Sequence, residues 1–373
     1  MTPKTEAELA DIIANADTPL SIHGGGTRPI GKPVQGNRLS VSGLSGIDLY
    51  DPGALTLVVQ AGTPVATVEA ALDKEGQRLA FEPMDHRGLL GTKGTPTMGG
   101  VVAANVSGPR RIQAGSCRDY LLGVRFVDGR GDIIKNGGRV MKNVTGYDLV
   151  KLMAGSYGTL GVMSQLSFKV LPKSEVTGTL LIRGLSDEKA VQALSAALGS
   201  PFDTTGAAHL PHDPDGPLTM IRLEGFESSV TYRAEQLSSL LAGIGACELE
   251  KGSDTSKRWT ALRDVAPFQD REGDVWRLSV KPTDAPAIVA GLDGVQAIYD
   301  WGGGLVWLLC PVGFDLRKKV APFGGHATLV RASMTTRATL PVFHPEPATL
   351  AALAANLRSQ FDPKGLLNPG LMG

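Results

Sequence analysis

A stretch rich in potential hydrogen-bond donors lies between Gly91 and Arg111, in the sequence GTKGTPTMGGVVAANVSGPRR. Its glycines can adopt positive φ and let the backbone come close to a ligand. Thr95, Thr97, Asn105 and Ser107 add short polar side chains. A surplus of amide and hydroxyl donors suits an anion such as a pyrophosphate. The same composition also fits a glycine-rich surface turn, so the rest of the chain must decide between the two.

A second glycine-rich loop follows a short predicted strand near the N-terminus. Pro19-Leu20-Ser21-Ile22 is typical of a strand, and His23-Gly24-Gly25-Gly26-Thr27-Arg28 comes directly after it. Two familiar nucleotide-binding motifs fail here. The G-x-G-x-x-G motif needs a glycine where Pro29 stands, and a P-loop beginning at Gly26 ends in Pro33, which has no hydroxyl for Mg²⁺. The loop is a candidate anion site of another class.

Composition restricts the class of protein. The 373 residues exceed what one core usually serves, so we expect two domains with a returning tail. Lys+Arg and Asp+Glu are equal at 37 each, which argues against a nucleic-acid partner. The three cysteines include no C-x-x-C pair, which excludes an ordinary four-cysteine iron–sulfur cluster and a disulfide framework within this chain.

Targeting signals are also missing from the sequence. The N-terminal segment MTPKTEAELADIIANA has no basic region followed by an apolar core. The longest apolar run, Leu305 to Pro311, is far shorter than the roughly 20 residues of a membrane helix. We therefore expect a cytoplasmic protein that reaches a membrane only through a partner.

Hydrophobic periodicity predicts an α+β fold. Period-3.6 patterns predict helices over residues 5–16, 65–75, 188–198, 230–242 and 349–361. Short β-branched or apolar runs predict strands over 55–61, 121–127, 162–170, 275–280 and 305–309. A third glycine-rich stretch, VMKNVTGYDLVKLMAGSYGTLGVM at 140–163, predicts one or two helical turns and then a return to a strand.

Taken in order, the GGGT loop, TPTMGGVVAANVSGPRR and KNVTGYDLVKLMAGSYGTLGV resemble the vanillyl-alcohol-oxidase-like family with a PCMH-type FAD-binding domain. The C-terminal FDPKGLLNPGLM resembles the D-2-hydroxyacid dehydrogenase branch, including the FAD-binding subunits of glycolate oxidase-like complexes. The likeness covers nearly the whole chain. It implies a PCMH-type FAD-binding domain of two α+β subdomains at 1–173, a smaller α+β cap domain with an antiparallel sheet on the substrate side at 174–330, and a tail at 331–373 that returns to the FAD domain.

The resemblance also implies where FAD binds. The cofactor-binding residues it implies are His23, Gly24, Gly25, Gly26, Thr27, Arg28, Pro96, Thr97, Gly99, Gly100, Ser107, Gly108, Gly146, Gly161, Val162 and Asn368. The amides of Gly24 to Thr27 would hold the pyrophosphate, and Asn368 would lie near the isoalloxazine. His23 stands where some relatives carry an arginine or tether the flavin covalently; we interpret it as a non-covalent neighbour.

Catalytic residues are less well marked. A hydroxy-acid carboxylate favours an arginine fork, and Arg277 and Arg331 are the candidates, with His326 as a base. Each of the three also fits an ordinary surface or packing role. The branch's His-x-Gly-Asp-Gly run is missing. His209 and His212 have metal-like spacing but flank Pro211 without a third ligand, so we predict no metal site.

These observations lead to one leading hypothesis and two alternatives. The chain is an FAD-binding subunit that oxidises glycolate or a related small 2-hydroxy acid, beside a second flavoprotein subunit and an iron–sulfur subunit that receives the electrons. One alternative is a self-sufficient FAD-dependent 2-hydroxy-acid dehydrogenase. The other is a non-catalytic flavin-binding assembly subunit.

Overall fold

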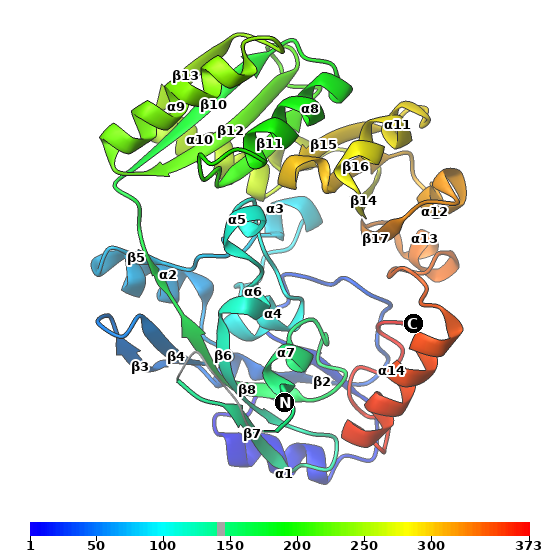
Figure 1. Cartoon of the computed structure of the whole chain (residues 1–373). Helices are drawn as coiled ribbons and strands as arrows, with labels where there is room; N and C mark the ends of the chain where they lie inside the picture. The colour runs from blue at the N-terminus through cyan, green and yellow to red at the C-terminus, as the bar shows by residue number, and fades with distance from the viewer. Residues whose placement is uncertain (140–145) are drawn as a thin grey trace. The chain divides into compact units, whose positions relative to one another are not determined.

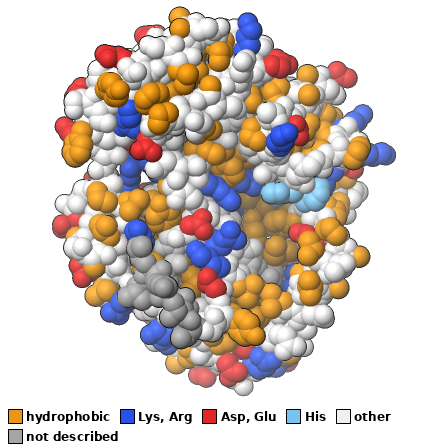
Figure 2. Space-filling model, viewed as in Figure 1, with side chains coloured by type: hydrophobic (Ala, Val, Ile, Leu, Met, Phe, Trp, Pro, Cys, Tyr) orange, Lys and Arg blue, Asp and Glu red, His pale blue; other side chains and the backbone are white. Residues whose placement is uncertain are grey.

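The computed structural model describes residues 1–139 and 146–373 and divides the chain into two compact units. Unit 1 comprises Met1–Ser107, Gly115–Lys173 and Pro345–Gly373, and unit 2 comprises Gly108–Ala114 and Ser174–His344. Figure 1 shows both units with mixed helices and sheets, so the α+β class is confirmed. The surface in Figure 2 carries acidic and basic side chains interspersed, as the zero net charge leads one to expect.

Unit 1 is built around a five-stranded antiparallel sheet in the order β3-β4-β8-β6-β7. Its strands are β3 (Ile47–Asp51), β4 (Thr56–Gln60), β8 (Val162–Lys169), β6 (Leu121–Val127) and β7 (Ile133–Gly137). Two small sheets accompany it, the parallel pair β1 (Leu20–His23) and β2 (Asn37–Ser40) and the antiparallel pair β5 (Gln77–Arg78) and β9 (Leu171–Pro172). The helices are α1 (Glu6–Ala14), α2 (Val65–Lys74), α3 (Arg87–Leu90), α4 (Met98–Ala103), α6 (Cys117–Tyr120), α7 (Leu149–Met153) and α14 (Ala348–Phe361).

The tail of the chain completes the β1 region of unit 1. Leu366 and Leu367 are buried in one cluster with Leu9, Leu20 and Val127. The main chain joins them as well, since Leu20 N donates to Leu366 O at 2.7 Å and Asn368 N donates to Leu20 O at 3.0 Å. The C-terminal motif is thereby held beside the strand that leads into the first glycine loop.

Unit 2 is built on an eight-stranded antiparallel sheet in the order β13-β10-β12-β11-β15-β16-β14-β17. The strands are β10 (Val176–Arg183), β11 (Gly206–Leu210), β12 (Leu218–Gly225), β13 (Cys247–Lys251), β14 (Asp274–Val280), β15 (Gln296–Asp300), β16 (Leu305–Cys310) and β17 (Gly325–Arg331). The helices are α5 (Arg111–Ala114), α8 (Asp187–Leu198), α9 (Glu227–Leu241), α10 (Ser253–Arg263), α11 (Ala285–Ala290), α12 (Leu316–Val320) and α13 (Met334–Thr339).

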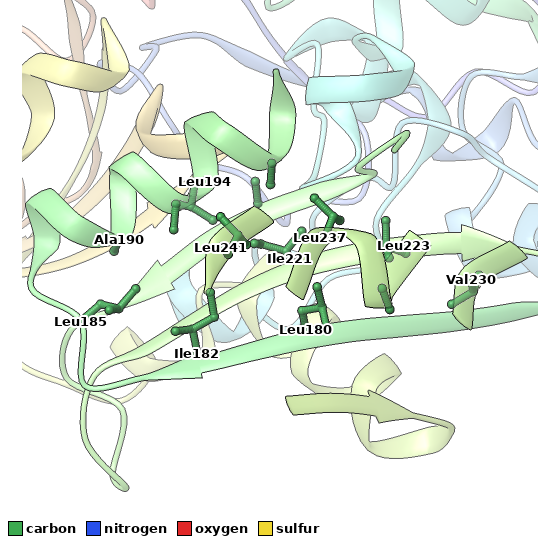
Figure 3. Packing of buried hydrophobic residues seen from close by; sticks show 14 residues of the cluster. Leu180, Ile182, Leu185, Ala190, Leu194, Ile221, Leu223, Val230, Leu237 and Leu241 are labelled. Atoms are coloured by element: carbon green, nitrogen blue, oxygen red, sulfur yellow. The ribbon is translucent and has the colours of Figure 1, made fainter. Parts of the chain in front are cut away.

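Two hydrophobic clusters hold this sheet to its helices. In the cluster of Figure 3, Leu180, Ile182 and Ile221 of the strands point toward Leu194 of α8 and Leu237 of α9. Alternate strand residues face this layer because side chains in a strand point to opposite faces in turn. At the other end of the sheet, Trp276, Leu278 and Tyr299 are fully buried in the second cluster.

The sequence patterns and the structure differ in several places. The stretch Gly91–Arg111, expected to be a loop, contains the short helix α4, which Thr97 caps by accepting a hydrogen bond from Gly100 N. Helix α10 has no predicted counterpart. Residues 331–344, grouped by sequence with the tail, lie in unit 2, and the return to unit 1 begins at Pro345.

Candidate functional site

The two glycine-rich loops of unit 1 lie against each other. A Cβ at Gly25 would overlap Thr95 O, and a Cβ at Gly94 would overlap Gly25 O. A Cβ at Gly24 would meet the Thr97 hydroxyl in the same way. Only glycine allows the approach of main chain to main chain at Gly25 and Gly94, so the residue type at these two positions is explained by contact between the loops.

The first loop presents a row of amides that have no acceptor among the described residues. Gly24, Gly25, Gly26, Thr27 and Arg28 donate no main-chain hydrogen bond within residues 1–139 and 146–373. Their carbonyls are used: Gly24 O accepts from Ser40 Oγ, Thr27 O from Thr92 Oγ1 and Arg28 O from Ile30 N. Consecutive amides with no internal acceptor form an anion-binding concavity.

The second loop supplies fewer amides than its composition suggests. Gly99 N donates to Ala61 O at 2.7 Å, and Gly100 N donates to Thr97 Oγ1 at 3.3 Å. Pro96 O accepts from Val65 N at 2.9 Å, which ties the loop to the start of α2. Hence Gly99 and Gly100 shape the site through close packing, and their amides are already used inside the chain.

Arg28 lies beside this second loop. Its Nε donates to His86 Nδ1 at 3.1 Å, and its Nη1 donates to Gly100 O at 2.8 Å. Burial among surrounding atoms lowers the pKa of Arg28 to about 10, and Tyr157, Asp85 and Cys117 oppose that shift. The guanidinium therefore remains charged at neutral pH.

A third segment, Gly155–Thr159, meets Asn368 from the tail. Asn368 Oδ1 accepts from Ile22 N at 2.7 Å, and its Nδ2 donates to Tyr157 O at 2.8 Å. Tyr157 adopts the left-handed region with φ of 52°. Asn368 is thus the residue that connects the tail, β1 and the third glycine stretch.

Ser156 is a site residue that sequence reasoning missed. It is 6% exposed, and its Oγ has no hydrogen-bond partner among the described residues. A buried hydroxyl without a partner is costly unless a ligand supplies one. Its neighbour Tyr157 interacts electrostatically with Arg28, which places this segment near the first loop. The G-S-Y-G spacing was the available signal.

His23 lies at the end of β1. Its Nε2 is 2.9 Å from Ser21 Oγ. Burial lowers the pKa of His23, and the positive charge of Arg38 lowers it further, so the imidazole is neutral at pH 7.

The remaining cofactor candidates are spread more widely. Ser107 Oγ accepts from Cys117 N at 3.0 Å in unit 1, whereas Gly108 belongs to unit 2, where its carbonyl accepts from Trp301 Nε1 at 3.1 Å. Gly161 is packed against the Phe126 ring, and Val162 is buried in the core.

The third glycine-rich motif is only partly described. Gly146 is exposed, with φ of 76°. Residues 142–145 of the same motif lie outside the described residues. The structure therefore brings together the first two loops, the segment Gly155–Thr159 and Asn368. No contact of Gly146 with these groups is seen among the described residues.

The three catalytic candidates lie on two neighbouring strands of unit 2. In the β14–β17 register Arg277 pairs with Thr328 and His326 with Ser279, which places these two on one face of the sheet. Arg331 pairs with Val275, beyond an irregularity in the register. Arg277 lies over the Trp301 ring, with Cζ 5.1 Å from the ring centre, and Arg111 lies over the same ring at 4.8 Å.

Arg331 and His326 differ in what surrounds them. The Arg331 guanidinium donates to Phe268 O at 2.8 Å and Arg271 O at 2.7 Å, and burial lowers its pKa. These bonds give Arg331 a structural role that its strand position did not reveal. His326 is exposed on the edge strand β17.

No group of three or more metal-ligating side chains is found in the described part of the chain. His209, half of the metal-like spacing, is fully buried, with Nδ1 2.9 Å from Thr219 Oγ1 and Nε2 3.3 Å from Asp187 Oδ1.

Among the described helices none is both long and apolar enough to cross a membrane.

The residues of unit 1 fit a dinucleotide diphosphate. The amides of Gly24–Arg28 lack internal acceptors, Arg28 adds a positive charge, and Ser156 adds an unsatisfied buried hydroxyl. FAD would supply acceptors for all three through its diphosphate and its polar atoms.

Comparison with known proteins agrees with this chemistry. Residues 1–137 match the family model described as an FAD binding domain. The chain is 39% identical over 359 residues to glycolate oxidase subunit GlcE of Escherichia coli K12, covering 95% of this chain and 93% of that protein. It is 32% identical to glycolate oxidase subunit GlcD of Bacillus subtilis 168 over 52% of this chain and 41% of that protein.

Solved structures show the same fold at low identity. An alkyldihydroxyacetonephosphate synthase matches with a TM-score of 0.71 and 16% identity, covering 99% of this chain and 76% of that one. A p-cresol methylhydroxylase with bound substrate matches with a TM-score of 0.71 and 14% identity, covering 100% of this chain and 88% of that one. The chain belongs to the GlcE family of glycolate oxidase subunits, within the FAD-dependent oxidoreductases that share the PCMH-type fold.

Proposed function

We propose that this chain is the FAD-carrying subunit of a glycolate oxidase-like complex in the cytoplasm, attached to a membrane only through its partners. It takes part in oxidising glycolate or a closely related small 2-hydroxy acid and passes electrons to an iron–sulfur subunit beside a second flavoprotein subunit. The observation that carries the proposal is near full-length identity of 39% to the E. coli glycolate oxidase subunit GlcE. The acceptor-free amides of Gly24–Arg28 support it independently.

The cofactor would be held mainly by unit 1. The amides of Gly24–Thr27 and the Arg28 guanidinium would bind the diphosphate, and Thr97 and Ser156 would add hydroxyls. Asn368, fixed by Ile22 N and Tyr157 O, would position the tail near the isoalloxazine. His23 is neutral and bonded to Ser21, which supports its interpretation as a neighbour without a covalent link.

Bound FAD would supply the two-electron acceptor for the α-hydrogen of the hydroxy acid. This chain's residues would bind and orient the substrate and remove its hydroxyl proton. Arg277, half-buried and stacked on Trp301, would bind the carboxylate through its planar fork. The exposed His326, on the same face of the sheet, would accept the proton. Arg331, whose guanidinium binds two carbonyls, would support this face without touching the substrate.

The chain's cysteine content supports an external electron acceptor. The sequence has only three cysteines, and Cys117 and Cys310 are buried. A four-cysteine cluster therefore needs another chain.

Reconstitution of the complex tests the proposal. We expect the purified chain to show the two visible absorption bands of oxidised flavin and to support glycolate-dependent electron transfer only with its partner subunits. Turnover of glycolate or D-lactate by the isolated chain with an artificial acceptor would instead establish a self-sufficient dehydrogenase. Full activity of the complex after removal of FAD from this chain alone would establish an assembly role.

Substitution separates substrate binding from folding. Arg277→Ala should raise KM for glycolate in the assembled enzyme, because the carboxylate loses a charged hydrogen-bond donor. Arg183→Ala, an exposed arginine at the end of β10, is the matched control and should leave KM unchanged. An unchanged KM in Arg277→Ala would remove that residue from the site.

A further inference from the structure

Trp301 carries two arginine side chains that come from separate elements of unit 2. The Cζ atom of Arg277, on β14, lies 5.1 Å from the centre of the Trp301 ring, and that of Arg111, on α5, lies at 4.8 Å. The two positive charges can be no further apart than these two distances together. Both arginines are half-buried, whereas Trp301 is 9% exposed. One buried indole thus gathers two positive charges that are far apart in the sequence.

Two other tryptophans of unit 2 each carry a single arginine. Arg222 lies over the Trp259 ring at 4.5 Å. Arg317 lies over the Trp276 ring at 4.8 Å. Both of these guanidiniums also donate to main-chain carbonyls, so they are part of the packing around the sheet. Among the described residues Trp301 alone holds an arginine from each of two elements.

The position of Trp301 is fixed through its main chain and its side chain. Its Nε1 donates to Gly108 O at 3.1 Å, and its main-chain N donates to Asp300 Oδ1 at 2.7 Å. Trp301 adopts the left-handed region with φ of 52°, which is uncommon for a bulky residue. The next residue, Gly302, has φ of 68°, and a Cβ there would overlap Leu198. Main-chain strain that the surroundings enforce in this way is typical of functional positions.

The segment that carries Arg111 is anchored on unit 2. Gly108–Ala114 belongs to this unit, although the residues before and after it belong to unit 1. Its anchors are the Gly108 carbonyl, which accepts from Trp301, and the buried fork of Arg110 with Glu224. Two adjacent arginines therefore differ in their surroundings. Arg110 is buried in an ion pair, and Arg111 is half-buried over the indole that also carries Arg277.

Two guanidiniums beside one ring have the chemistry to bind a small carboxylate. A cation–π contact holds an arginine through its charge and not through a hydrogen-bond acceptor. The two oxygens of a carboxylate can each accept from a different guanidinium. Two neighbouring positive charges also repel each other, and an anion bound to both relieves that repulsion.

We propose that Arg111 is a second arginine that binds the substrate carboxylate, and that Trp301 is the positioning residue that holds it near Arg277. The inference rests on the proposed function, in which Arg277 binds the carboxylate of a small 2-hydroxy acid. It adds a binding residue that local sequence did not distinguish from its neighbour Arg110. The substrate site then has two positive charges, both fixed by one indole.

Steady-state kinetics of the reconstituted complex with glycolate test the role of Arg111. Arg111→Gln should raise KM by about 10- to 100-fold, because a charged hydrogen-bond donor is lost, and should change kcat by less than about twofold. Arg183→Gln removes an exposed arginine at the end of β10; it is the matched control and should leave KM unchanged. A wild-type KM in Arg111→Gln would overturn the role of Arg111.

Trp301 is tested by removal and rescue in the same assay. Trp301→Leu should raise KM about tenfold, because neither guanidinium is then held, and Trp301→Phe should restore most of the loss because it keeps an aromatic face. Trp259→Leu removes a buried indole that carries Arg222, so it is the matched control and should leave KM unchanged even where it lowers stability. Equal increases in Trp301→Leu and Trp301→Phe would show that the indole only packs.

The outcomes separate this inference from the proposed function. A reconstituted wild-type complex that does not oxidise glycolate or another small 2-hydroxy acid would contradict the proposed function itself. An active complex in which Arg277→Ala raises KM and Arg111→Gln does not would overturn only the second arginine. A lower kcat with unchanged KM in Arg111→Gln would place its effect at a step other than carboxylate binding and would also overturn it.

Discussion

Arg28 in unit 1 and Arg110 in unit 2 are both enclosed arginines, but their surroundings are opposite. Arg110 forms a fork with Glu224, and the two side chains are 5% and 4% exposed. Arg222 lies 3.8 Å from the same carboxylate and stacks on Trp259. Arg28 has no carboxylate partner among the described residues. The buried Arg110–Glu224 pair satisfies its charges within the fold, whereas the half-buried Arg28 keeps a positive charge that an anionic ligand could use.

The position of Arg110 in the sequence makes the contrast more informative. It lies three residues after Ser107, at the end of the glycine-rich stretch, yet it belongs to unit 2. The Arg110–Glu224 fork therefore anchors the end of the cofactor stretch in a different unit from its beginning.

The largest effect should come from breaking the paired arginine. Glu224→Gln should destabilise the chain by about 3–5 kcal/mol, because it leaves Arg110 buried with no counter-charge. Chemical denaturation would measure it. Asp254→Asn, in an exposed pair with Lys257, is the control and should have no measurable effect. A Glu224→Gln protein as stable as the wild type would show that the fork is not a structural anchor.

The second largest effect should come from disturbing the contact between the two glycine-rich loops of unit 1. Gly25→Ala should cost about 1–3 kcal/mol and abolish FAD binding, because the added Cβ overlaps Thr95 O and forces the loops apart. Gly138→Ala meets nothing within 4 Å and should be neutral. Thermal unfolding with and without FAD would measure both, and FAD affinity retained in Gly25→Ala would contradict the close-packed arrangement.

Substitution of Arg28 should change the free energy of unfolding in the opposite direction to breaking the Arg110–Glu224 pair. Without cofactor, Arg28→Gln should leave the free energy of unfolding unchanged or raise it by up to about 1 kcal/mol, since it removes an uncompensated charge. With FAD present the same substitution should lower the stabilisation that the cofactor gives. A large loss of stability in the apo protein would mean that Arg28 is structural, like Arg110.

The smallest effect should come from the partly exposed ion pair between Glu6 and Arg125. Burial alone would raise the pKa of Glu6, but hydrogen bonds from Arg125 and Ser164 outweigh it and hold that pKa below its usual value. This stability is present above the ordinary glutamate pKa of about 4.3 and is lost as pH falls through the lowered value. Solvent screening should keep it below about 1 kcal/mol.

Glu6→Gln should remove this part of the acid dependence. Denaturation curves of wild type and mutant at neutral pH and in acid would measure it. A mutant that loses as much stability in acid as the wild type would show that Glu6 does not contribute.

The sequence was sufficient to predict the loops and helices that local residue patterns determine. Triple glycine after a strand and donors between glycines were sufficient to predict both loops, and helices over 188–198 and 349–361 were visible in their periodicity. Helix α4 was missed because Gly99 and Gly100 are poor helix formers, and contacts with residues distant in sequence, such as Ala61 and Thr63, help to hold it.

Contacts between residues far apart in the sequence could not be predicted from local residue patterns. Arg110 and Glu224 are 114 residues apart, and nothing local distinguishes Arg110 from Arg111. The same holds for Arg28 and His86, 58 residues apart. Arg331 was a reasonable carboxylate-binding candidate by residue type, yet its guanidinium binds Phe268 O and Arg271 O, contacts that only the folded sheet creates.

The most direct test of the account is the absorption spectrum of the purified full-length chain before and after acid precipitation. The account predicts one flavin per chain, released into the supernatant as FAD when the protein is denatured, because amides and Arg28 hold it without a covalent bond. A chain with no flavin bands, even after incubation with FAD, or a flavin that stays in the precipitate would contradict it.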